Sequence, residues 1–385
     1  MSGAAPYERR LLIGDRGNGL LRKFWRVPWL FVLLLGAVAA VGYVALWSAG
    51  NGPEAYAQKH AFRFGFGLVM MLSIALVDIR LIARAAYAGY ALGIALLVLV
   101  LLHGNVGKGA QRWIDIGPLQ LQPSELMKIM LALALAAWFQ RASWEKVGNL
   151  LFLLPPVAMI LVPMGLILKQ PNLGTALITG MIGAAIFFSA GVRLWKFLLI
   201  LGGVAGIAPI AYEHLRDYQK ARINTFLDPE SDPLGAGYNI IQSKIALGSG
   251  GMWGKGFMQG TQGHLNFLPE KQTDFIFTMI AEEFGLVGAL ATLALLALVV
   301  IFCFVVAFRC RHQFGRLLAV GLGTNIFLYV FVNIAMVTGS IPVGGVPLPL
   351  ISHGGSAMLT TMLGFGLLMS VHVHRDVEFG EPRGR

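Results

Sequence analysis

Long uncharged runs are the feature that most constrains what this chain can fold into. The stretch from Trp29 to Trp47 contains no charged residue, and a helix needs about 20 mostly apolar residues to cross a bilayer. Charged residues make up only 13% of the chain, about half of the roughly 25% in soluble domains. Further apolar runs are Phe64–Val77, Ala85–Leu102, Leu126–Phe139, Leu150–Leu168, Leu173–Ala190, Phe197–Tyr212, Phe284–Phe308, Leu317–Val337 and Met358–Val371. We therefore expect an all-α integral membrane protein with about ten transmembrane helices.

The basic residues follow the pattern of a multi-pass membrane protein. Lys and Arg are frequent in the leader, in the tail and in every second expected loop, and they are sparse in the other short loops. Positive charge marks the cytoplasmic side of a membrane, so we expect both termini in the cytoplasm. This distribution accounts for the net charge of +11, and nucleic acid is not an expected partner.

The expected topology divides the chain into segments. Residues 1–28 form a cytoplasmic leader, whose mixed basic and aromatic side chains favour an interfacial anchor. Residues 29–212 contain transmembrane helices 1–7, and 213–273 form a large extracytoplasmic loop between the seventh and the eighth. Residues 274–374 contain helices 8–10, and 375–385 form a cytoplasmic tail.

Several stretches interrupt the apolar sequence with Gly, Pro and polar residues, namely Gly104–Lys128, Leu168–Leu177 and Gly339–Ala357. Irregular backbone at membrane depth is tolerated only where it faces protein or a wet cavity. On the expected topology these stretches open to the outer face, beside the large loop. Within that loop, Ile240–Leu247 is expected to lie on the outer interface as a short amphipathic helix. The convergence predicts a functional site on the outer side of the membrane.

Asp274 stands where the large loop meets the eighth span, and two interpretations are open. Thr273 or Asp274 would serve as the N-cap of the helix. Alternatively, a carboxylate at a boundary between water and membrane is partly desolvated, which raises its basicity and suits a general base. Glu282 lies further along the same span, where pairing with a neighbouring helix is favoured over catalysis.

Glu125 and Lys128 form a second candidate group. Gln122, Glu125 and Lys128 are spaced i, i+3 and i+6, so they share one stripe of the expected fourth span, and Glu125 can pair with Lys128. A structural ion pair and a substrate-binding role are both open. Arg112 and Lys255, in outer segments, are donors suited to phosphate. The competing interpretation of each is a solvated surface charge.

His353, Cys303 and Cys310 are interpreted as packing residues. His353 has no carboxylate near it in the sequence, where hydrogen bonding or packing is the simpler role. The two cysteines show no zinc or disulfide spacing. The chain also lacks the motifs of serine hydrolases and zinc proteases.

Together these motifs resemble the SEDS family, named for shape, elongation, division and sporulation, and within it the rod-shape-determining members. The stretches that carry the resemblance are RWIDIGPLQLQPSELMK, QPNLGTAL, YQKARINTFLDPESDPLGAGYNIIQSKIALGSGG, GKGFMQGTQGHLNFLPEKQTDFIFTMIAEEFG and GGVPLPLISHGGSAM. They cover the central and C-terminal parts of the chain in order. The resemblance implies a fold of about ten spans. It also implies a glycosyltransferase that polymerises lipid II into β-1,4 glycan strands outside the cytoplasmic membrane during cell elongation.

On this resemblance the family's essential aspartate corresponds to Asp274, and the polar pair of its QPSE-x-x-K motif to Glu125 and Lys128. Lipid II is an α-linked pyrophosphate and the strand is β-linked, so the displacement inverts the anomeric centre. Such a step needs a base for the acceptor hydroxyl, expected to be Asp274, and stabilisation of the leaving group. The candidates for the second role are Arg112, Lys128 and Lys255, and a divalent cation such as Mg²⁺ or Mn²⁺.

The family resemblance also bears on cofactors and partners. The family usually has Asp where this chain has Asn172, which argues against a charged carboxylate in cation binding or pairing there. No metal ligands stand out in the sequence, and no organic cofactor is expected. The implied partners are lipid II, a class B penicillin-binding protein acting as transpeptidase, other proteins of the rod-shape complex, and membrane lipids.

Two other classes of function stay open on the residues alone. Transporters and lipid flippases also place Gly and Pro breaks near polar residues. Against a transporter, no internal repeat is visible and the breaks gather on one face instead of the membrane midplane. The remaining hypothesis is a scaffold without catalysis that only activates the transpeptidase.

Overall fold

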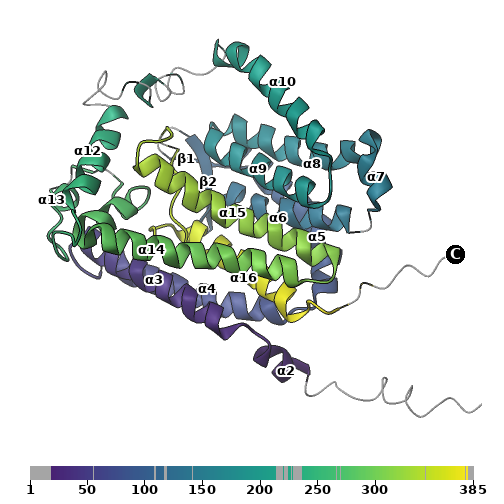
Figure 1. Cartoon of the computed structure of the whole chain (residues 1–385), viewed down its shortest axis with the longest axis horizontal. Coiled ribbons are helices and arrows are strands. Elements are labelled where there is room, and N and C mark those ends of the chain that lie inside the picture. Colours follow the sequence, from purple (N-terminus) through teal and green to yellow (C-terminus); the bar gives the residue numbers. More distant parts are fainter. Residues whose placement is uncertain are drawn as a thin grey trace, which may run out of the picture.

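The structure, a computed structural model, describes residues 19–54, 56–107, 110–116, 119–140, 142–213, 220, 224–226, 228, 236–265, 267–268, 270–342, 344–377 and 379. Within these residues the chain is a helical bundle with one small sheet (Figure 1). In chain order the elements are α2 (Gly19–Trp25), α3 (Trp29–Ala49), α4 (Ala57–Leu76), α5 (Ile79–His103), β1 (Asn105–Gly107), β2 (Ala110–Ile116), β3 (Leu119–Leu121), α6 (Pro123–Phe139), α7 (Trp144–Gly148), α8 (Leu150–Lys169), α9 (Leu173–Ser189), α10 (Leu194–Glu213), α12 (Ala236–Ser249), α13 (Thr261–His264), α14 (Ile276–Arg309), α15 (Gln313–Val337) and α16 (Gly355–Val373).

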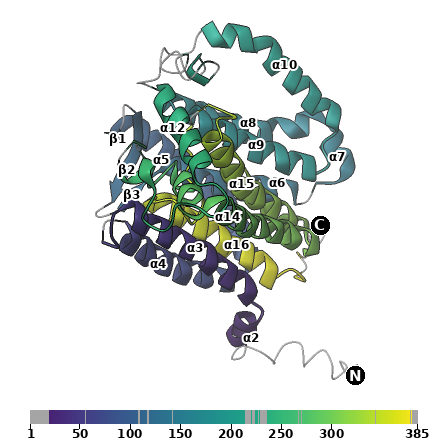
Figure 2. The ribbon, with the colours of Figure 1, turned by 60° about the vertical axis from the view of Figure 1, so that its left-hand side comes forward.

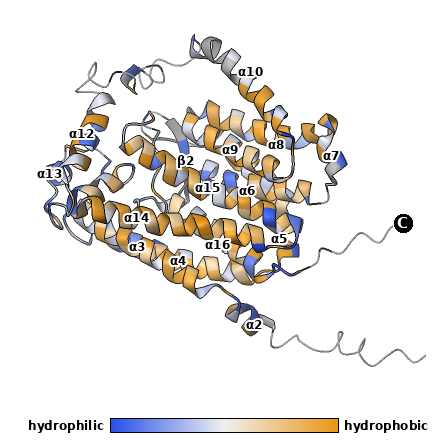
Figure 3. Cartoon of the chain, viewed as in Figure 1, coloured by the Kyte–Doolittle hydropathy of each residue, from blue (hydrophilic) through white to orange (hydrophobic). Residues whose placement is uncertain are grey.

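The long helices are apolar enough to cross a membrane. In the part of the chain that the structure describes, 7 helices meet that condition of length and composition, namely α3, α4, α5, α8, α14, α15 and α16. α9 and the first part of α10 are shorter apolar helices, and Figure 3 shows that apolar residues dominate the bundle. The predicted all-α, multi-pass membrane protein is confirmed. The number of about ten spans stays a prediction.

α6 occupies the interior of the bundle. It contacts α5, α8, α9, α15 and α16, and most of its side chains are buried. A helix that is apolar around most of its circumference suits such a position. Its Glu125 and Lys128 are buried with the rest, and charges at this depth require partners inside the protein.

The two ends of the bundle differ. α12 and α13 lie at one end of the long helices, here called the outer end, whereas α2 and the C-terminal segment lie at the other (Figures 1 and 2). Residues from Gly104–Lys128, Leu168–Leu177 and Gly339–Ala357 line one cavity together. The predicted convergence of these interrupted stretches therefore appears in the structure.

A three-stranded antiparallel sheet leads into α6, in a stretch that the sequence predicted only as irregular. β1 pairs with β2 and β2 pairs with β3, with Trp113 opposite Asn105 and Ile114 opposite Leu121. After β3 the chain enters α6 with Pro123 in the first turn, where a missing N–H costs nothing and the fixed φ favours the helix. The sheet thereby places β2 beside the start of α6.

α12 includes Ile240–Leu247, the segment predicted as a short helix. It packs against α14 and α15, and Ser243 is fully buried in that contact. The Ser243 hydroxyl donates to the carbonyl of Val337 at 2.8 Å and lies 3.1 Å from Thr278 Oγ1. One face of α12 is therefore packed on the bundle, and the expected position of this segment on the outer membrane interface stays a prediction.

α14 is kinked at Gly285, and the glycine-rich loop after α12 fills the kink. Gly285 has φ 65° and ψ −164°, a combination that is essentially restricted to glycine. The loop backbone hydrogen-bonds to α14 on both sides of the kink: Lys255 N donates to Glu282 O at 3.0 Å, and Leu286 N donates to Gly251 O at 2.9 Å. Backbone groups freed by the kink are thus satisfied by the loop.

A side chain at Gly285 has no room in this contact. A Cβ there would lie 2.3 Å from Gly254 N and 2.6 Å from the Met252 carbonyl. We expect Gly285→Ala to lower the free energy of unfolding by about 1–3 kcal/mol, because it combines backbone strain with overpacking. Thermal unfolding in detergent checks this, with Gly165→Ala, whose Cβ would meet nothing within 4 Å, as the control. Equal melting temperatures for the two variants would contradict it.

Candidate functional site

One cavity at the outer end of the bundle brings together most of the predicted site residues. Its volume is about 480 Å³. It is lined by β2 and β3, the starts of α6 and α9, the turn before α14, the loop before α16, and Tyr329 of α15. The lining residues are Arg112, Trp113, Gln120, Gln122, Glu125, Asn172, Thr175, Glu270, Thr273, Asp274, Tyr329, Gly345, Val346, Pro347, His353, Gly354, Ser356 and Ala357.

Asp274 lies partly buried on the wall of this cavity, immediately before α14. The helix begins at Ile276 with Phe275 as its N-cap, and the Phe275 side chain makes no capping hydrogen bond. The N-cap position therefore lies one residue after Asp274 and two after Thr273. The cavity wall facing the Asp274 carboxylate includes Gly345, where an added Cβ would lie 3.7 Å from Asp274 Oδ2.

The main chain around Asp274 is fixed by buried polar side chains. Asn333 of α15 is fully buried, and its Nδ2 donates to the carbonyls of Asp274 at 2.9 Å and Val346 at 2.7 Å. Ser352 adds a second tie, because its hydroxyl donates to Thr273 O at 2.5 Å and accepts from Leu348 N at 2.7 Å. The turn before α14 and the loop before α16 are therefore bound together beside the carboxylate.

Glu125 and Lys128 form the buried ion pair that their spacing predicts, with 2.8 Å between Lys128 Nζ and Glu125 Oε1. Tyr329 completes the group. Its hydroxyl donates to the Glu125 carboxylate, at 2.6 Å from Oε1 and 2.5 Å from Oε2, and also contacts Lys128 Nζ. Glu125 and Tyr329 line the cavity, whereas Lys128 lies behind them and does not.

Arg112 and Asn172 form the part of the wall contributed by β2 and α9. Arg112 Nε donates to the carbonyl of Gln170 at 3.2 Å, and its Nη2 donates to that of Pro171. Asn172 is the N-cap of α9 and accepts from Thr175 N at 3.3 Å. Asp and Asn are about equally good at an N-cap, so a neutral amide suffices for the contact seen at this position.

Lys255 lies outside the cavity that contains Asp274. Its Nζ is 2.7 Å from Glu282 Oε1 and 2.8 Å from Thr261 Oγ1, in the loop beside the kink of α14. Glu282, for which the sequence favoured pairing with a neighbouring helix over catalysis, is paired with this loop lysine and also accepts from Gln262 N at 3.1 Å. The structure thus brings Lys255 together with Glu282 and separates it from Arg112 and Asp274.

His353 contributes a neutral ring to the cavity. Its Nε2 lies 3.4 Å from Arg63 Nη1, and its ring contacts Tyr56 edge-on with 4.9 Å between centroids. Burial, followed by the positive charge of Arg63, His60 and Lys59, lowers the pKa of His353 to about 4. The imidazole is therefore uncharged at neutral pH, in agreement with its predicted role in hydrogen bonding and packing.

A metal centre built from protein ligands is not apparent in the described parts of the chain. No group of three or more His, Cys, Asp or Glu side chains there is arranged to hold an ion. The cavity wall carries the carboxylates of Glu125, Glu270 and Asp274, but Glu125 is engaged by Lys128 and Tyr329. The divalent cation therefore stays a prediction, and no catalytic step is assigned to it.

Tyr329 and Asn333 were not predicted from the sequence as site residues. Both lie in α15, an otherwise apolar helix, and they are spaced i, i+4, which places them on one face. Polar residues inside a membrane helix usually face protein or a wet cavity. The i, i+4 spacing of these two polar residues could have identified them from the sequence. They were missed because the run Leu317–Val337 was predicted only as a membrane span.

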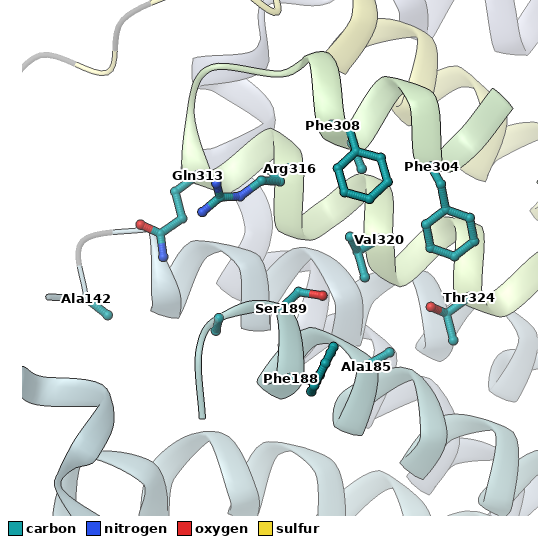
Figure 4. A pocket seen from close by; sticks show the side chains of 12 residues that line it. Ala142, Ala185, Phe188, Ser189, Phe304, Phe308, Gln313, Arg316, Val320 and Thr324 are labelled. Atoms are coloured by element: carbon teal, nitrogen blue, oxygen red, sulfur yellow. The ribbon is translucent and has the colours of Figure 1, made fainter. Parts of the chain in front are cut away.

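Another hollow, of about 570 Å³, lies between α9, α14 and α15 (Figure 4). Phe304 and Phe308 of α14 and Phe188 of α9 project into it, and Arg316 and Gln313 lie at the start of α15. No carboxylate is among its lining residues. This hollow is larger than the cavity beside Asp274, but it lacks the groups that acid–base chemistry requires.

The fold and the cavity define a multi-pass membrane protein with a carboxylate site at one end of its bundle. The family model described as "Cell cycle protein", for FtsW, RodA and SpoVE, matches residues 23–377. The chain belongs to this FtsW/RodA/SpoVE family.

Individual relatives agree with the family. The peptidoglycan glycosyltransferase MrdB of Escherichia coli K12 is 44% identical over 353 residues, which cover 90% of this chain and 93% of that protein. A chain from a structure on "structural coordination of polymerization and crosslinking by a peptidoglycan synthase complex" has a TM-score of 0.80 and 34% identity, covering 91% of this chain and 98% of that one. The rod-shape-determining protein RodA of Thermus thermophilus has a TM-score of 0.69 and 29% identity, covering 91% of this chain and 98% of that one.

The Glu125–Lys128 pair gives a direct test of the wall of the cavity. We expect Glu125→Leu to destabilise the protein by about 3–5 kcal/mol, because it leaves the Lys128 ammonium buried without its carboxylate. The double variant Glu125→Leu, Lys128→Met is expected to recover most of that loss, since apolar replacements of a buried pair are often neutral. Thermal unfolding in detergent measures both. If the double variant is as unstable as the single one, the unpaired Lys128 ammonium is not the cause of the lost stability.

Proposed function

We propose that this protein is a peptidoglycan glycosyltransferase that polymerises lipid II into β-1,4 glycan strands during cell elongation. The observation that carries the proposal is the position of Asp274, partly buried on the wall of a polar cavity at the outer end of a membrane bundle. Membership of the FtsW/RodA/SpoVE family and 44% identity to the glycosyltransferase MrdB support it.

The proposed reaction is a single inverting displacement. The acceptor hydroxyl attacks the anomeric carbon of the donor sugar, the new glycosidic bond forms, and the bond to the lipid pyrophosphate breaks. Asp274 takes the proton of the hydroxyl as general base. The hydrogen bonds from Asn333 and Ser352 hold the main chain that carries the carboxylate.

Charge develops on the leaving pyrophosphate, and Arg112 is the donor best placed to stabilise it. Its guanidinium side chain lines the same cavity as Asp274, and planar N–H donors match phosphate oxygens. Lys128 acts indirectly in this proposal, because it lies behind Glu125 and fixes that carboxylate. The direct role expected of Lys255 stays a prediction, since its ammonium is engaged by Glu282 outside the cavity.

The proposed setting is the cytoplasmic membrane with the cavity open to the outside. The positive-inside pattern of the loops supports cytoplasmic termini and an outward-facing site. A class B penicillin-binding protein is the proposed partner for crosslinking, alongside other rod-shape proteins. The 34% identical chain from a peptidoglycan synthase complex supports a partnership of this kind.

Replacement of the proposed base gives the central prediction. We expect Asp274→Asn to reduce lipid II polymerisation by about 10²–10⁴-fold, because the amide cannot accept the proton. The measurement uses purified protein in detergent with labelled lipid II and the cognate transpeptidase. Glu54→Gln is the matched control, an acid-to-amide change at an exposed residue outside the cavity. A folded Asp274→Asn protein with normal polymerisation would remove the base assignment.

The same assay separates the other classes of function. Glycan strands from the purified protein support a polymerase. Lipid transfer across vesicles without strands would indicate a flippase, and neither activity together with tight binding to the transpeptidase would indicate a scaffold. Either of the last two results would overturn the proposed function.

A divalent cation is proposed to enter with the pyrophosphate of the substrate, since no group of three or more His, Cys, Asp or Glu side chains in the described residues is arranged to hold an ion. We expect EDTA to abolish polymerisation and Mg²⁺ or Mn²⁺ to restore it. In the absence of lipid II, the same cations are expected to leave the melting temperature unchanged, since a ligand stabilises only the state that it binds. Polymerisation at full rate in EDTA would contradict the proposed requirement for a divalent cation.

A further inference from the structure

Large apolar side chains are exposed where the glycine-rich loop meets α14. The loop, residues 250–260, connects α12 to α13 at the outer end of the bundle (Figure 1). Its Met252 and Trp253 are 58% and 78% exposed. Apolar side chains that are exposed together mark a contact with another surface.

This exposed surface continues onto α14. The carbonyl of Met252 accepts from Val287 N at 3.2 Å, so the loop lies directly against the segment of α14 that follows the kink. Leu286, Val287 and Leu290 of that segment are exposed, and they belong to a helix long and apolar enough to cross a membrane. Met252 and Trp253 therefore extend the side of α14 that faces lipid in a membrane-spanning bundle.

The length of α14 places the loop at the edge of the bilayer. The last turn of the helix carries Arg309. From Val287 to Arg309 the helix is about 33 Å long, and the hydrocarbon core of a bilayer is about 30 Å thick. When Arg309 lies at one interface, Val287 lies near the other, together with Met252 and Trp253. Tryptophan is enriched at this depth, because its ring is apolar and its N–H is polar.

The main chain of the loop also suits contact with lipid. Backbone groups in an apolar environment need hydrogen-bond partners within the protein. Groups of the loop that have such partners are the amides of Gly254, Lys255 and Gly256 and the carbonyls of Gly250, Gly251 and Met252. Lys255 is the single charged residue of the loop, and its ammonium is held 2.7 Å from Glu282 Oε1 of α14.

We propose that Met252 and Trp253 anchor the loop in the lipid leaflet at the outer end of the bundle. The Trp253 ring lies between the head groups and the acyl chains, and Met252 contacts acyl chains beside Val287. Transfer of their exposed apolar surface from water into lipid drives the insertion. Because the loop is hydrogen-bonded to α14 on both sides of Gly285, the anchor fixes the depth of this helix in the membrane. The anchor does not depend on the proposed glycosyltransferase activity.

A lipid surface fits these side chains better than a water-soluble protein domain. Leu286, Val287 and Leu290 lie at or below the edge of the hydrocarbon, where a domain outside the membrane does not reach them. Met252 and Trp253 form one continuous surface with them, so whatever covers all five side chains must extend into the bilayer. The acyl chains and head groups of the leaflet do so at every point of the surface. A membrane-spanning helix of another protein is the alternative, and it gives a different result in the experiment.

The test uses the full chain in lipid nanodiscs with a nitroxide label at Trp253→Cys. The native Cys303 and Cys310 are buried, so the introduced thiol is the one that reacts. Collisions of the label with oxygen, which dissolves in hydrocarbon, are compared with collisions with a polar nickel chelate, which stays in water. We expect an oxygen-to-nickel ratio about fivefold above that of the control Glu54→Cys, an exposed residue between α3 and α4. Leu290→Cys, on the exposed side of α14, is the lipid-facing reference.

A second measurement protects the test against misfolding of the cysteine variant. The emission of Trp253, obtained as the difference between the wild-type and Trp253→Phe proteins, is expected to fall by about half in lipid brominated near the head groups. A label at Trp253→Cys as accessible to nickel as the one at Glu54→Cys, or emission that brominated lipid leaves unchanged, would overturn the proposal. A label that loses its contact with oxygen when the transpeptidase is added would also overturn it, because the surface would then belong to a protein partner.

Discussion

One buried amide holds together the cavity that contains Asp274. Asn333 donates from α15 to two carbonyls that no helix satisfies, those of Asp274 and Val346. A backbone carbonyl buried in the bundle without a hydrogen-bond partner costs roughly several kcal/mol, because neither lipid nor packed side chains can replace the hydrogen bond to water. The turn before α14 and the loop before α16, which are far apart in the sequence, are thereby held by the same side chain. The position of Asp274 consequently depends on α15 as much as on the helix that follows it.

Two of the three acidic residues that line the cavity, Glu125 and Asp274, are in different environments. Glu125 is buried and engaged by both Lys128 and Tyr329, so its negative charge is already compensated. Asp274 is only partly buried, and the wall opposite its carboxylate is formed by the backbone of a glycine, Gly345. Environments that differ in this way separate structural carboxylates from reactive ones. The contrast favours proton transfer at Asp274 and a supporting role for Glu125.

Local patterns in the sequence predicted the helices well, and contacts between distant segments account for what was missed. An apolar run is a property of neighbouring residues, so α3, α8 and α15 could be located from composition alone. The Glu125–Lys128 pair was predictable because its spacing lies within one helix. The pairing of Lys255 with Glu282 was not, since it depends on how the glycine-rich loop folds back onto α14. The strands β1 and β3 were missed because each has only 3 residues.

The kink at Gly285, where the glycine-rich loop contacts α14, divides that helix into two segments. Between Asp274 and Gly285 the helix is buried from Ile276 to Glu283, whereas beyond Gly285 many of its side chains are exposed. The glycine-rich loop hydrogen-bonds to the main chain on both sides of the kink, through Lys255 N and Leu286 N. A partner that binds this loop from outside would therefore also act on the short buried segment that follows Asp274.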